Sequence, residues 1–425
     1  IGFSMTSKAA HKSATDRPHL SKGMLTRASI LKTARTVFKT AGYYGASVSE
    51  ITRQSNVSMG TFYQYFKNKE QLFIELTDLV VSDFIEKSEY DYPREGDFKE
   101  RLHGIVFRCL QHTRDNFAFH RTLGESELVD RVTIGYYESI VRYFRDFFRE
   151  EIQSGAAKPL DPNMIAYALI GICDFIAMDW GAGEIGFEPD QAVELIADIL
   201  CQGINGKAPW QKHPGWDTLS LPDPSQLETN GLKPLTRGQK TRRALFRAAE
   251  KVFGTHGVNH ASISEITREA GVAQGTFYIH FESKNDLVEG FVRYINRNLR
   301  REVQRIVTGV VDRRDVEWMG MLAFYNFLSR HRSIYRVVPE FEIIGHELGL
   351  WYYKKLAQGY VQGLEQGIAR QEIRSLSPVF LARYLMGFTH FIGLKWIVWG
   401  NASHPGIPPA LFTDIRELVL FGLAK

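Results

Sequence analysis

An internal repeat constrains this chain more than any other feature of its sequence. Residues 46–66, ASVSEITRQSNVSMGTFYQYF, and residues 261–281, ASISEITREAGVAQGTFYIHF, are identical at 13 of 21 positions without a gap. The same offset of 215 residues pairs further identical residues on both sides: Thr26 with Thr241, Ala34 with Ala249, Phe38 with Phe253, Gly42 with Gly257, Lys69 with Lys284 and Leu72 with Leu287. The string therefore belongs to a duplicated structural unit.

The duplication extends through both halves of the chain. The same offset pairs Arg121 with Arg336, Glu125 with Glu340, Glu127 with Glu342 and Tyr137 with Tyr352. After a shift of one residue it pairs Gly171 with Gly387, Phe175 with Phe391 and Ile176 with Ile392. Each half is thus a complete unit of roughly 190–200 residues, a spacing far longer than that of solenoid repeats.

A linker is predicted between the two halves. The chain has 425 residues, which is too long for one ordinary domain. Residues 206–234 contain five prolines and no sustained hydrophobic periodicity. Fully extended, this segment would reach roughly 90–100 Å, enough to carry the chain from the end of one unit to the start of the next.

The hydrophobic pattern of both halves predicts an all-α fold. Apolar residues follow helical spacing at Leu31, Ala34 and Phe38, and strand signals are scarce. Ser47 and Ser262 are each followed three residues later by a glutamate, as in a helix capping box. Asn68 and Ser283 are further predicted N-caps.

Within the repeated string we predict a helix-turn-helix. A capped helix over 48–55, a tight connection at 56–57 and a second helix that opens at Ser58 have this spacing. Gly60 and Gly275 recur near the start of the second helix, where a glycine costs about 1 kcal/mol relative to alanine. Their recurrence indicates that something approaches the backbone closely there.

Positive charge is concentrated in the two copies. Residues 22–69 contain eight Lys or Arg and one acid, a balance of +7, and residues 237–284 contain eight and four, a balance of +4. The rest of the chain therefore sums to −7, because the net charge is +4. This distribution is the one that a polyanion-binding surface requires.

The strings TFYQYFKNKEQL and TFYIHFESKNDL, each after a short capped helix, resemble the DNA-binding domain of the TetR family of bacterial transcriptional regulators. The resemblance covers residues 22–80 and 237–295. It implies two tandem units, each with a helix-turn-helix DNA-binding domain followed by a helical ligand-binding and dimerisation domain. We expect DNA-binding domains at 22–75 and 235–290, regulatory domains at 76–205 and 291–425, and a linker at 206–234.

The resemblance also implies roles for the matched residues. Those expected to bind phosphates are Ser47, Ser262, Tyr63, Tyr278, Tyr65, His280, Lys69 and Lys284. Those expected to face or border base edges are Ser49, Ser264, Ser58, Ala273, Met59, Gln274, Thr61, Thr276, Gln64 and Ile279, beside Gly60 and Gly275. Four aromatic residues are expected to be core instead: Phe62, Phe66, Phe277 and Phe281.

The two copies differ where bases would be read. Gln274 can bond to an adenine edge through two hydrogen bonds, whereas Met59 offers only apolar contact, for example to a thymine methyl group. The two helix-turn-helices are thus two unlike readers of DNA bases. Two such readers on one chain predict an operator with two unlike half-sites. The second copy also has extra acids, including Glu250 and Glu269, so we expect the first copy to dominate the electrostatic attraction to DNA.

The family dimerises through the last two long helices of its helical domain. The matching segments here lie near 162–180, 190–204, 378–400 and 410–424. We expect these four helices to pack together within one chain as a pseudo-dimer; two chains with four DNA-binding domains are the alternative. Candidate ligand contacts are Phe119, Tyr137, Phe175, Trp318, Phe324, His346, Tyr352 and His390, although aromatic residues at helical spacing are more often core.

Other classes of function have little support in the sequence. The string GAGEIG at 181–186 fits a dinucleotide fingerprint, but it follows a helix rather than a strand. No zinc-ligand cluster, nucleophile elbow or P-loop is found, so we expect no enzyme, cofactor or metal. Cys109, Cys173 and Cys201 read as buried thiols. The chain has no secretory signal and no apolar run long enough for a membrane span, so we expect it in the cytoplasm.

Double-stranded DNA and a small hydrophobic effector are thus the predicted partners. The first hypothesis is a repressor that such an effector releases. The second is a DNA-binding regulator that a protein partner controls, or that has no ligand.

Overall fold

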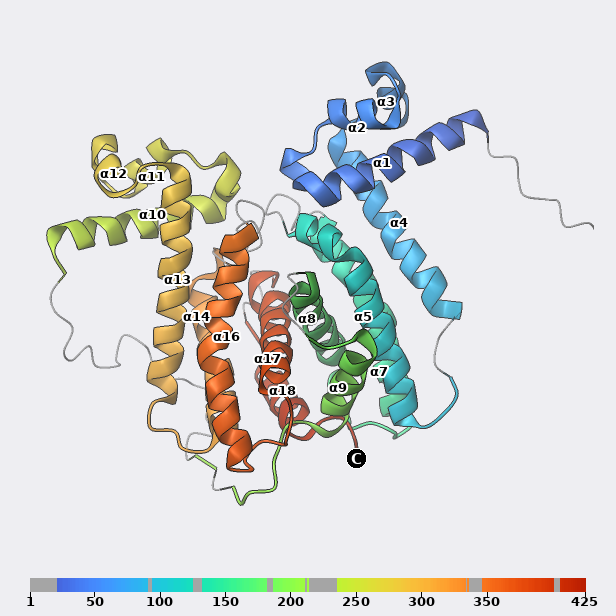
Figure 1. The fold of residues 1–425 in the computed structure, drawn as a ribbon, viewed down its shortest axis with the longest axis vertical. Coiled ribbons are helices and arrows are strands. Elements are labelled where there is room, and N and C mark those ends of the chain that lie inside the picture. The colour runs from blue at the N-terminus through green and yellow to red at the C-terminus, as the bar shows by residue number, and fades with distance from the viewer. Residues whose placement is uncertain are drawn as a thin grey trace, which may run out of the picture. The chain divides into compact units, whose positions relative to one another are not determined.

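The computed structural model describes residues 21–90, 94–124, 132–181, 186–210, 212–213, 235–333, 335, 346–400 and 406–425. The described residues form helices, with a single isolated β-bridge between Asn205 and Ile373. Packing divides the chain into two compact units that meet within one helix, the first ending at Leu76 and the second beginning at Thr77. Figure 1 shows the helices in chain order.

The first unit contains α1 (Lys22–Gly45), α2 (Val48–Ser55), α3 (Met59–Tyr65) and the start of α4 (Lys69–Tyr90). Gly42 breaks α1 with φ 70°, a left-handed value that favours glycine. Ser47 and Ser58 accept from the backbone amides that open α2 and α3. Asn56, with φ 54°, ends α2 in the left-handed conformation. The predicted helix-turn-helix is therefore confirmed to the residue.

The second copy has the same construction, in α10 (Arg237–His260), α11 (Ile263–Glu269), α12 (Gln274–His280) and α13 (Lys284–Val307). Gly257 breaks α10 with φ 72°, as Gly42 breaks α1. The capping box of Ser262 and Glu265 is complete. That of Ser47 is half formed, because the Glu50 carboxylate bonds to Arg53 and Gln54 instead. The expected core phenylalanines, Phe62, Phe66, Phe277 and Phe281, are all buried.

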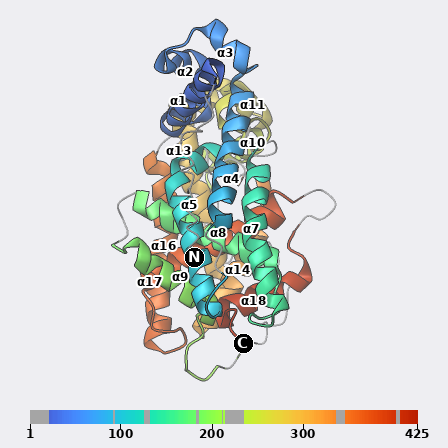
Figure 2. The same ribbon diagram turned by 90° about the vertical axis from the view of Figure 1, so that its right-hand side faces the viewer.

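The body of the second unit is a bundle of long helices from both halves. The first half supplies α5 (Phe98–Leu123), α7 (Ile134–Gln153), α8 (Pro162–Gly181) and α9 (Pro189–Gln202). The second half supplies α14 (Arg313–Arg330), α16 (His346–Ala369), α17 (Pro378–Gly393), a π-helix (Leu394–Val398) and α18 (Pro409–Phe421). In Figure 1, α8 and α17 lie side by side near the centre of this bundle, and Figure 2 shows the same bundle turned by 90°.

Helices α8, α9, α17 and α18 form a seam between the two halves. Gly171 and Gly387 bring α8 and α17 into backbone contact, because a Cβ atom added to Gly171 would lie 2.4 Å from the carbonyl oxygen of Gly387. Both helices are apolar along their length, as a buried crossing requires. The expectation that these four helices pack together within one chain is met.

The seam is reciprocal, like the interface of a two-fold symmetric dimer. The amide of Ile204 donates to the carbonyl oxygen of Val419, and the amide of Leu423 donates to that of Leu200. Two ion pairs repeat the same relation: Lys158 with Glu417 at 2.8 Å, and Arg374 with Asp198 at 2.5 Å. Both sides of this seam thus come from the same chain.

The first residues of the predicted linker are packed rather than extended. The amides of Gly206 and Ala208 donate to carbonyl groups at Glu372 and Gln371. The buried guanidinium of Arg314 donates to the carbonyl oxygen of Ala208 at 3.0 Å. The segment after α9 is therefore fastened to the second half, while residues 214–234 lie outside the described residues.

The structure corrects one detail of the repeat. Tyr136, rather than Tyr137, corresponds to Tyr352, because the Tyr136 hydroxyl contacts His120 as that of Tyr352 contacts Tyr335. The three cysteines are buried, as expected, and residues 182–185 of the glycine-rich string lie outside the described residues. Residues 125, 127, 336, 340 and 342 lie outside the described residues. Within the described part, no helix has the length and apolar character of a bilayer span.

Candidate functional site

Both copies present the same surface on their second motif helix. Among the predicted DNA-contacting residues on α3 and α12 none is buried. Tyr63 and Tyr278 are 54% and 55% exposed, and the apolar side chains of Met59 and Ile279 are 43% and 78% exposed. Large apolar and aromatic groups that are exposed on a short helix are typical of a surface that a partner covers.

The two glycines of this surface have no structural need within the protein. A Cβ atom added to Gly275 would meet no described atom within 4 Å, and one added to Gly60 would meet only Ser58 Oγ, at 3.7 Å. Neither glycine has a left-handed φ. The close approach that the sequence predicts therefore has no counterpart among the described residues of the protein.

Several hydroxyls of the predicted set are helix caps. Ser47 Oγ accepts from the amide of Glu50 at 3.1 Å, and Ser262 Oγ donates to the Glu265 carboxylate at 2.7 Å. Ser58 Oγ accepts from the amide of Thr61 at 3.0 Å. Its counterpart Ala273 makes no side-chain cap, so the second reader lacks an interaction worth about 1 kcal/mol. Ser49 and Ser264 are exposed beside the caps.

Lys69 and Lys284, which are predicted phosphate ligands, bond to backbone carbonyl groups of the protein. Lys69 Nζ donates to the carbonyl oxygens of Tyr43 and Ala46, at 2.7 and 3.0 Å. Lys284 Nζ donates to those of Val258, Asn259 and Ala261, at 3.0 to 3.1 Å. These carbonyl groups follow the glycine breaks in α1 and α10. The ammonium groups thus hold together the turn before the helix-turn-helix.

Tyr65 and His280 lie beside the first turn of α1 and α10. A Cβ atom added to Gly23 would lie 3.2 Å from the Tyr65 hydroxyl, and one added to Gly238 would lie 3.8 Å from the His280 ring. Both side chains are half-buried. The predicted residues Thr61 and Thr276 are also half-buried, whereas Gln64 and Gln274 are exposed.

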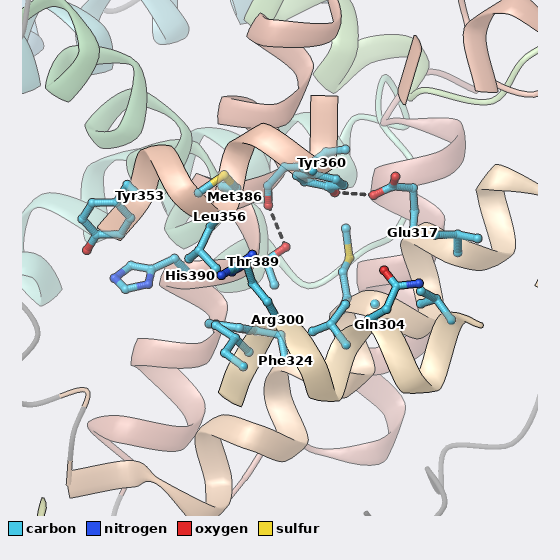
Figure 3. A pocket seen from close by; sticks show the side chains of 18 of the residues that line it. Arg300, Gln304, Glu317, Phe324, Tyr353, Leu356, Tyr360, Met386, Thr389 and His390 are labelled. Carbon is cyan, nitrogen blue, oxygen red and sulfur yellow. Dashed lines mark hydrogen bonds between the residues drawn. The ribbon is translucent and has the colours of Figure 1, made fainter. Parts of the chain in front are cut away.

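The second half contains a cavity of about 510 Å³. Helices α13, α14, α16 and α17 enclose it, and Phe175 of α8 reaches it from the first half. Figure 3 shows Arg300 and Gln304 of α13 on one side and Tyr353, Met386 and His390 on the other. Its size is within the range of small-molecule sites.

The cavity is apolar inside and cationic at α13. His390 has no hydrogen-bond partner among the described residues, and burial lowers its pKa to about 4, so its ring is neutral at pH 7. The hydroxyls of Tyr335 and Tyr352 lie 3.1 Å apart, and burial raises the pKa of Tyr352 to about 12. Arg297, Arg300 and Arg301 also line the cavity.

The charges at the cavity wall are only partly balanced. Arg313 pairs with the buried carboxylate of Glu317 at 2.5 Å, and the Tyr360 hydroxyl donates to the same carboxylate, as Figure 3 shows. Arg300 donates to the Asn296 side chain at 2.9 Å. Arg297 and Arg301 have no ion pair among the described residues. The wall thus has a net positive charge, which favours an anionic group at this end of the cavity.

A second cavity, of about 110 Å³, lies between the two halves. The first half contributes His120, Tyr137 and Asp174 to its wall, and the second half contributes Phe391 of α17. His120 Nδ1 lies 3.0 Å from the Asp174 carboxylate, and burial beside that carboxylate raises the pKa of Tyr137. The two cavities share four wall residues: Phe175, Tyr335, Tyr353 and His390.

The predicted ligand contacts divide into three groups. Phe175, Phe324, Tyr352 and His390 line the large cavity, and Tyr137 lines the small one. Phe119 and Trp318 line neither: Phe119 is fully buried, and Trp318 packs against Phe412 and Arg416. The side chain of His346 lies outside the described residues. Sequence reasoning missed the arginines of α13, although three in five residues at 297–301 is a charge cluster that a search for anion sites finds.

In the comparison with known sequences, one family model matches both copies of the repeat. The sequence model described as "Bacterial regulatory proteins, tetR family" matches twice, at residues 30–76 and 245–290. The HTH-type transcriptional regulator YdgC of Bacillus subtilis (strain 168) is 39% identical over 196 residues, which cover 44% of this chain and 95% of YdgC. The fatty acid metabolism regulator protein of the same organism is 28% identical over 184 residues, covering 42% and 95%.

Solved structures give matches of the same extent. The transcriptional regulator FadR from Bacillus subtilis, in complex with stearoyl-CoA, matches with a TM-score of 0.37 and 23% identity, over 40% of this chain and 96% of that one. A tetR-family protein from Rhodococcus RHA1 matches with a TM-score of 0.36 and 19% identity, over 41% and 94%. Each match covers nearly all of the relative but less than half of this chain.

Proposed function

Because the chain belongs to the tetR family of bacterial regulatory proteins and has the family's DNA-binding domain twice, we propose that it is a repressor that binds one operator through two unlike readers. The observation that carries this proposal is the pair of matched surfaces on α3 and α12. They share exposed tyrosines at 63 and 278, and differ at Met59 and Gln274. Phosphate contacts would come from the shared residues, and base contacts from the unlike ones.

The reciprocal seam supports the proposal that one chain is sufficient. A family member with one unit needs a second copy to build this interface, whereas here α8 and α9 meet α17 and α18 of the same chain. Two readers on one chain would then occupy successive major grooves, about 34 Å apart. The two half-sites would differ in sequence.

We further propose that the effector is an apolar molecule with an anionic group. The cavity is lined largely by apolar and aromatic side chains, and three arginines of α13 lie at its wall. The name of one relative, a fatty acid metabolism regulator, is compatible with such a ligand. The cavity favours this proposal over control by a protein partner alone.

Helix α13 supplies the route from ligand to DNA. Its first residue, Lys284, bonds to the turn before the second reader, and its far end, from Arg297 to Val307, lines the cavity. Glu250 of α10 also contacts His331 at the end of α14, at 2.8 Å. A ligand that binds two arrangements of α13 with different affinity would change the position of the second reader.

Selection of bound sites from a random duplex pool tests the proposal. We expect an enriched asymmetric site, and weaker binding after addition of dansylaminoundecanoate, a fluorescent anion with an apolar chain. No enrichment at moderate salt would contradict the DNA-binding proposal. Unchanged DNA affinity with the cavity saturated would contradict release by a ligand.

A further inference from the structure

The helices that enclose the large cavity can be aligned residue by residue with those of the first half. Asp97 and Asp312 cap α5 and α14 at an offset of 215 residues, and Gly171 and Gly387 fix an offset of 216 for α8 and α17. Tyr335, Tyr353, His390 and Phe175 line both cavities, so the small cavity lies beside the large one, across the seam. The first-half equivalents of other residues around the large cavity, Ile105 and Tyr143 among them, line neither cavity.

We propose that the chain has a single effector site, in its second half, and that side chains permanently fill the equivalent site of the first half. This inference rests on the proposed function for the identity of the ligand, but not for the difference between the halves. A dimer of identical subunits has two equivalent sites. Here duplication has left the second-half site open, at about 510 Å³, and the equivalent first-half positions filled.

Two glycines keep the second-half site open. A Cβ atom added to Gly359 of α16 would meet no described atom within 4 Å, and one added to Gly320 of α14 would meet only Val303 Cγ1, at 3.9 Å. Neither glycine has a left-handed φ, so no turn requires them. Both line the cavity, and larger side chains at these positions would enter it.

Large side chains stand at the equivalent positions of the first half. Ile105, fully buried, corresponds to Gly320, and Tyr143 corresponds to Gly359. The Tyr143 hydroxyl donates to the carbonyl oxygen of Ser88 at 3.2 Å, which closes the space between α4 and α7. The ring of Phe84 lies 5.4 Å from that of Tyr143 and 4.5 Å from that of His112. These contacts form a packed aromatic core where the second half has space.

The charges of the side chains around the cavity also differ from those at the equivalent positions of the first half. Arg297, Arg300 and Arg301 correspond, at the offset of 215 residues that pairs Lys69 with Lys284, to Ser82, Ile85 and Glu86. The neutral ring of His390 corresponds to Asp174, whose carboxylate contacts His120. The first half thus has neither the volume nor the positive charge for an apolar anion.

The proposed effector site in the second half also has a wall residue from the first half. Phe175 of α8 is part of the large cavity's wall and lies 5.3 Å from His390. A ligand in the second half would contact the seam as well as α13. We therefore expect one ligand per chain and a binding curve without cooperativity, because no second equivalent site exists to be coupled.

Thiol labelling tests the difference between the halves without any ligand. Cys173 of the first half is the equivalent of Thr389, which lines the open cavity. In the folded chain we expect N-ethylmaleimide to label the cysteine of the variant Thr389→Cys at least ten times faster than native Cys173, with labelled peptides identified by mass. Adding Gly359→Leu should slow labelling of that cysteine. Gly135→Leu, at an exposed helix position of the first half, is the matched control.

The outcomes distinguish a failure of this inference from a failure of the proposed ligand class. Equal labelling of both thiols, fast or slow, would overturn the inference. In parallel, titration with dansylaminoundecanoate should give one probe per chain for the wild type and none for Gly359→Leu. Two probes per chain, or one that remains in Gly359→Leu, would also overturn it. Unequal labelling without any probe binding would sustain the difference between the halves and contradict the proposed ligand class.

Discussion

Gly171 of α8 and Gly387 of α17 lie backbone against backbone, so that a Cβ atom on either would stand 2.3 to 2.4 Å from the other's carbonyl oxygen. They are equivalent residues of the two halves, and each is the other's neighbour. This relation is the signature of an isologous contact. It places the axis that relates the two halves of the bundle between these two residues.

The crossing at these glycines predicts a large effect of substitution. Gly171→Leu should lower the free energy of unfolding of the whole chain by about 3 kcal/mol, because overpacking forces the two helices apart. Urea denaturation measures the change. Gly135→Leu, where an added Cβ would meet no described atom within 4 Å, should have almost no effect. Equal effects of the two substitutions would mean that the glycine contact does not hold the seam.

A substitution of Lys284 distinguishes a structural role of this side chain from a contact with DNA. Lys284→Met removes three hydrogen bonds to carbonyl groups, so stability should fall by about 1–3 kcal/mol. The salt dependence of DNA binding should keep its slope, because no phosphate contact is lost. Denaturation and binding at several salt concentrations measure both quantities. A slope lower by about one, with stability unchanged, would restore the phosphate role that the sequence predicted.

An exchange between the readers tests which residues read bases. Gln274→Met should change the selected sequence of the second half-site alone, by about 1–3 kcal/mol of discrimination at one position. Met59→Gln is the matched control, and should change the first half-site alone. Site selection with each variant measures the outcome. Identical selected sites for wild type and both variants would show that neither side chain reads a base.

His390 predicts a pH dependence of stability. Its pKa is about 4 in the folded chain and 6.5 in the unfolded one, so folding favours the neutral ring. The folded chain therefore has its full stability above pH 6.5 and loses stability as the pH falls toward 4, because the unfolded chain binds the proton more tightly. Relative to His390→Gln, the wild type should lose about 2–3 kcal/mol between pH 7 and pH 4.5. Urea denaturation at both pH values measures it; parallel losses would mean that the ring is not desolvated.

Local sequence signals were sufficient for the DNA-binding domains. The left-handed turn at Asn56 before Ser58, and the helix breaks at Gly42 and Gly257, depend on contacts within a few residues. Contacts of such short range can be recognised from the spacing of residue types in the sequence. The bonds of Lys69 and Lys284 to carbonyl groups were not predicted, because these partners lie 23 to 26 residues away, beyond a kink that no spacing rule describes.

The cavity was predictable only in part. The candidates His390 and Phe324 line the cavity, whereas Trp318 and Phe119, with the same helical spacing, pack in the core. Whether an aromatic residue lines a space depends on what stands opposite it on another helix. Gly359 determines that space, and a single glycine in a long helix gives no local sign of it.

The mass of the protein bound to its selected duplex distinguishes one chain from two. We expect one 48.5-kDa chain on an asymmetric site. Tyr63→Ala and Tyr278→Ala should each weaken that complex, because both readers are in contact with the same duplex. Two chains on a palindrome, with one of the two substitutions silent, would contradict the account.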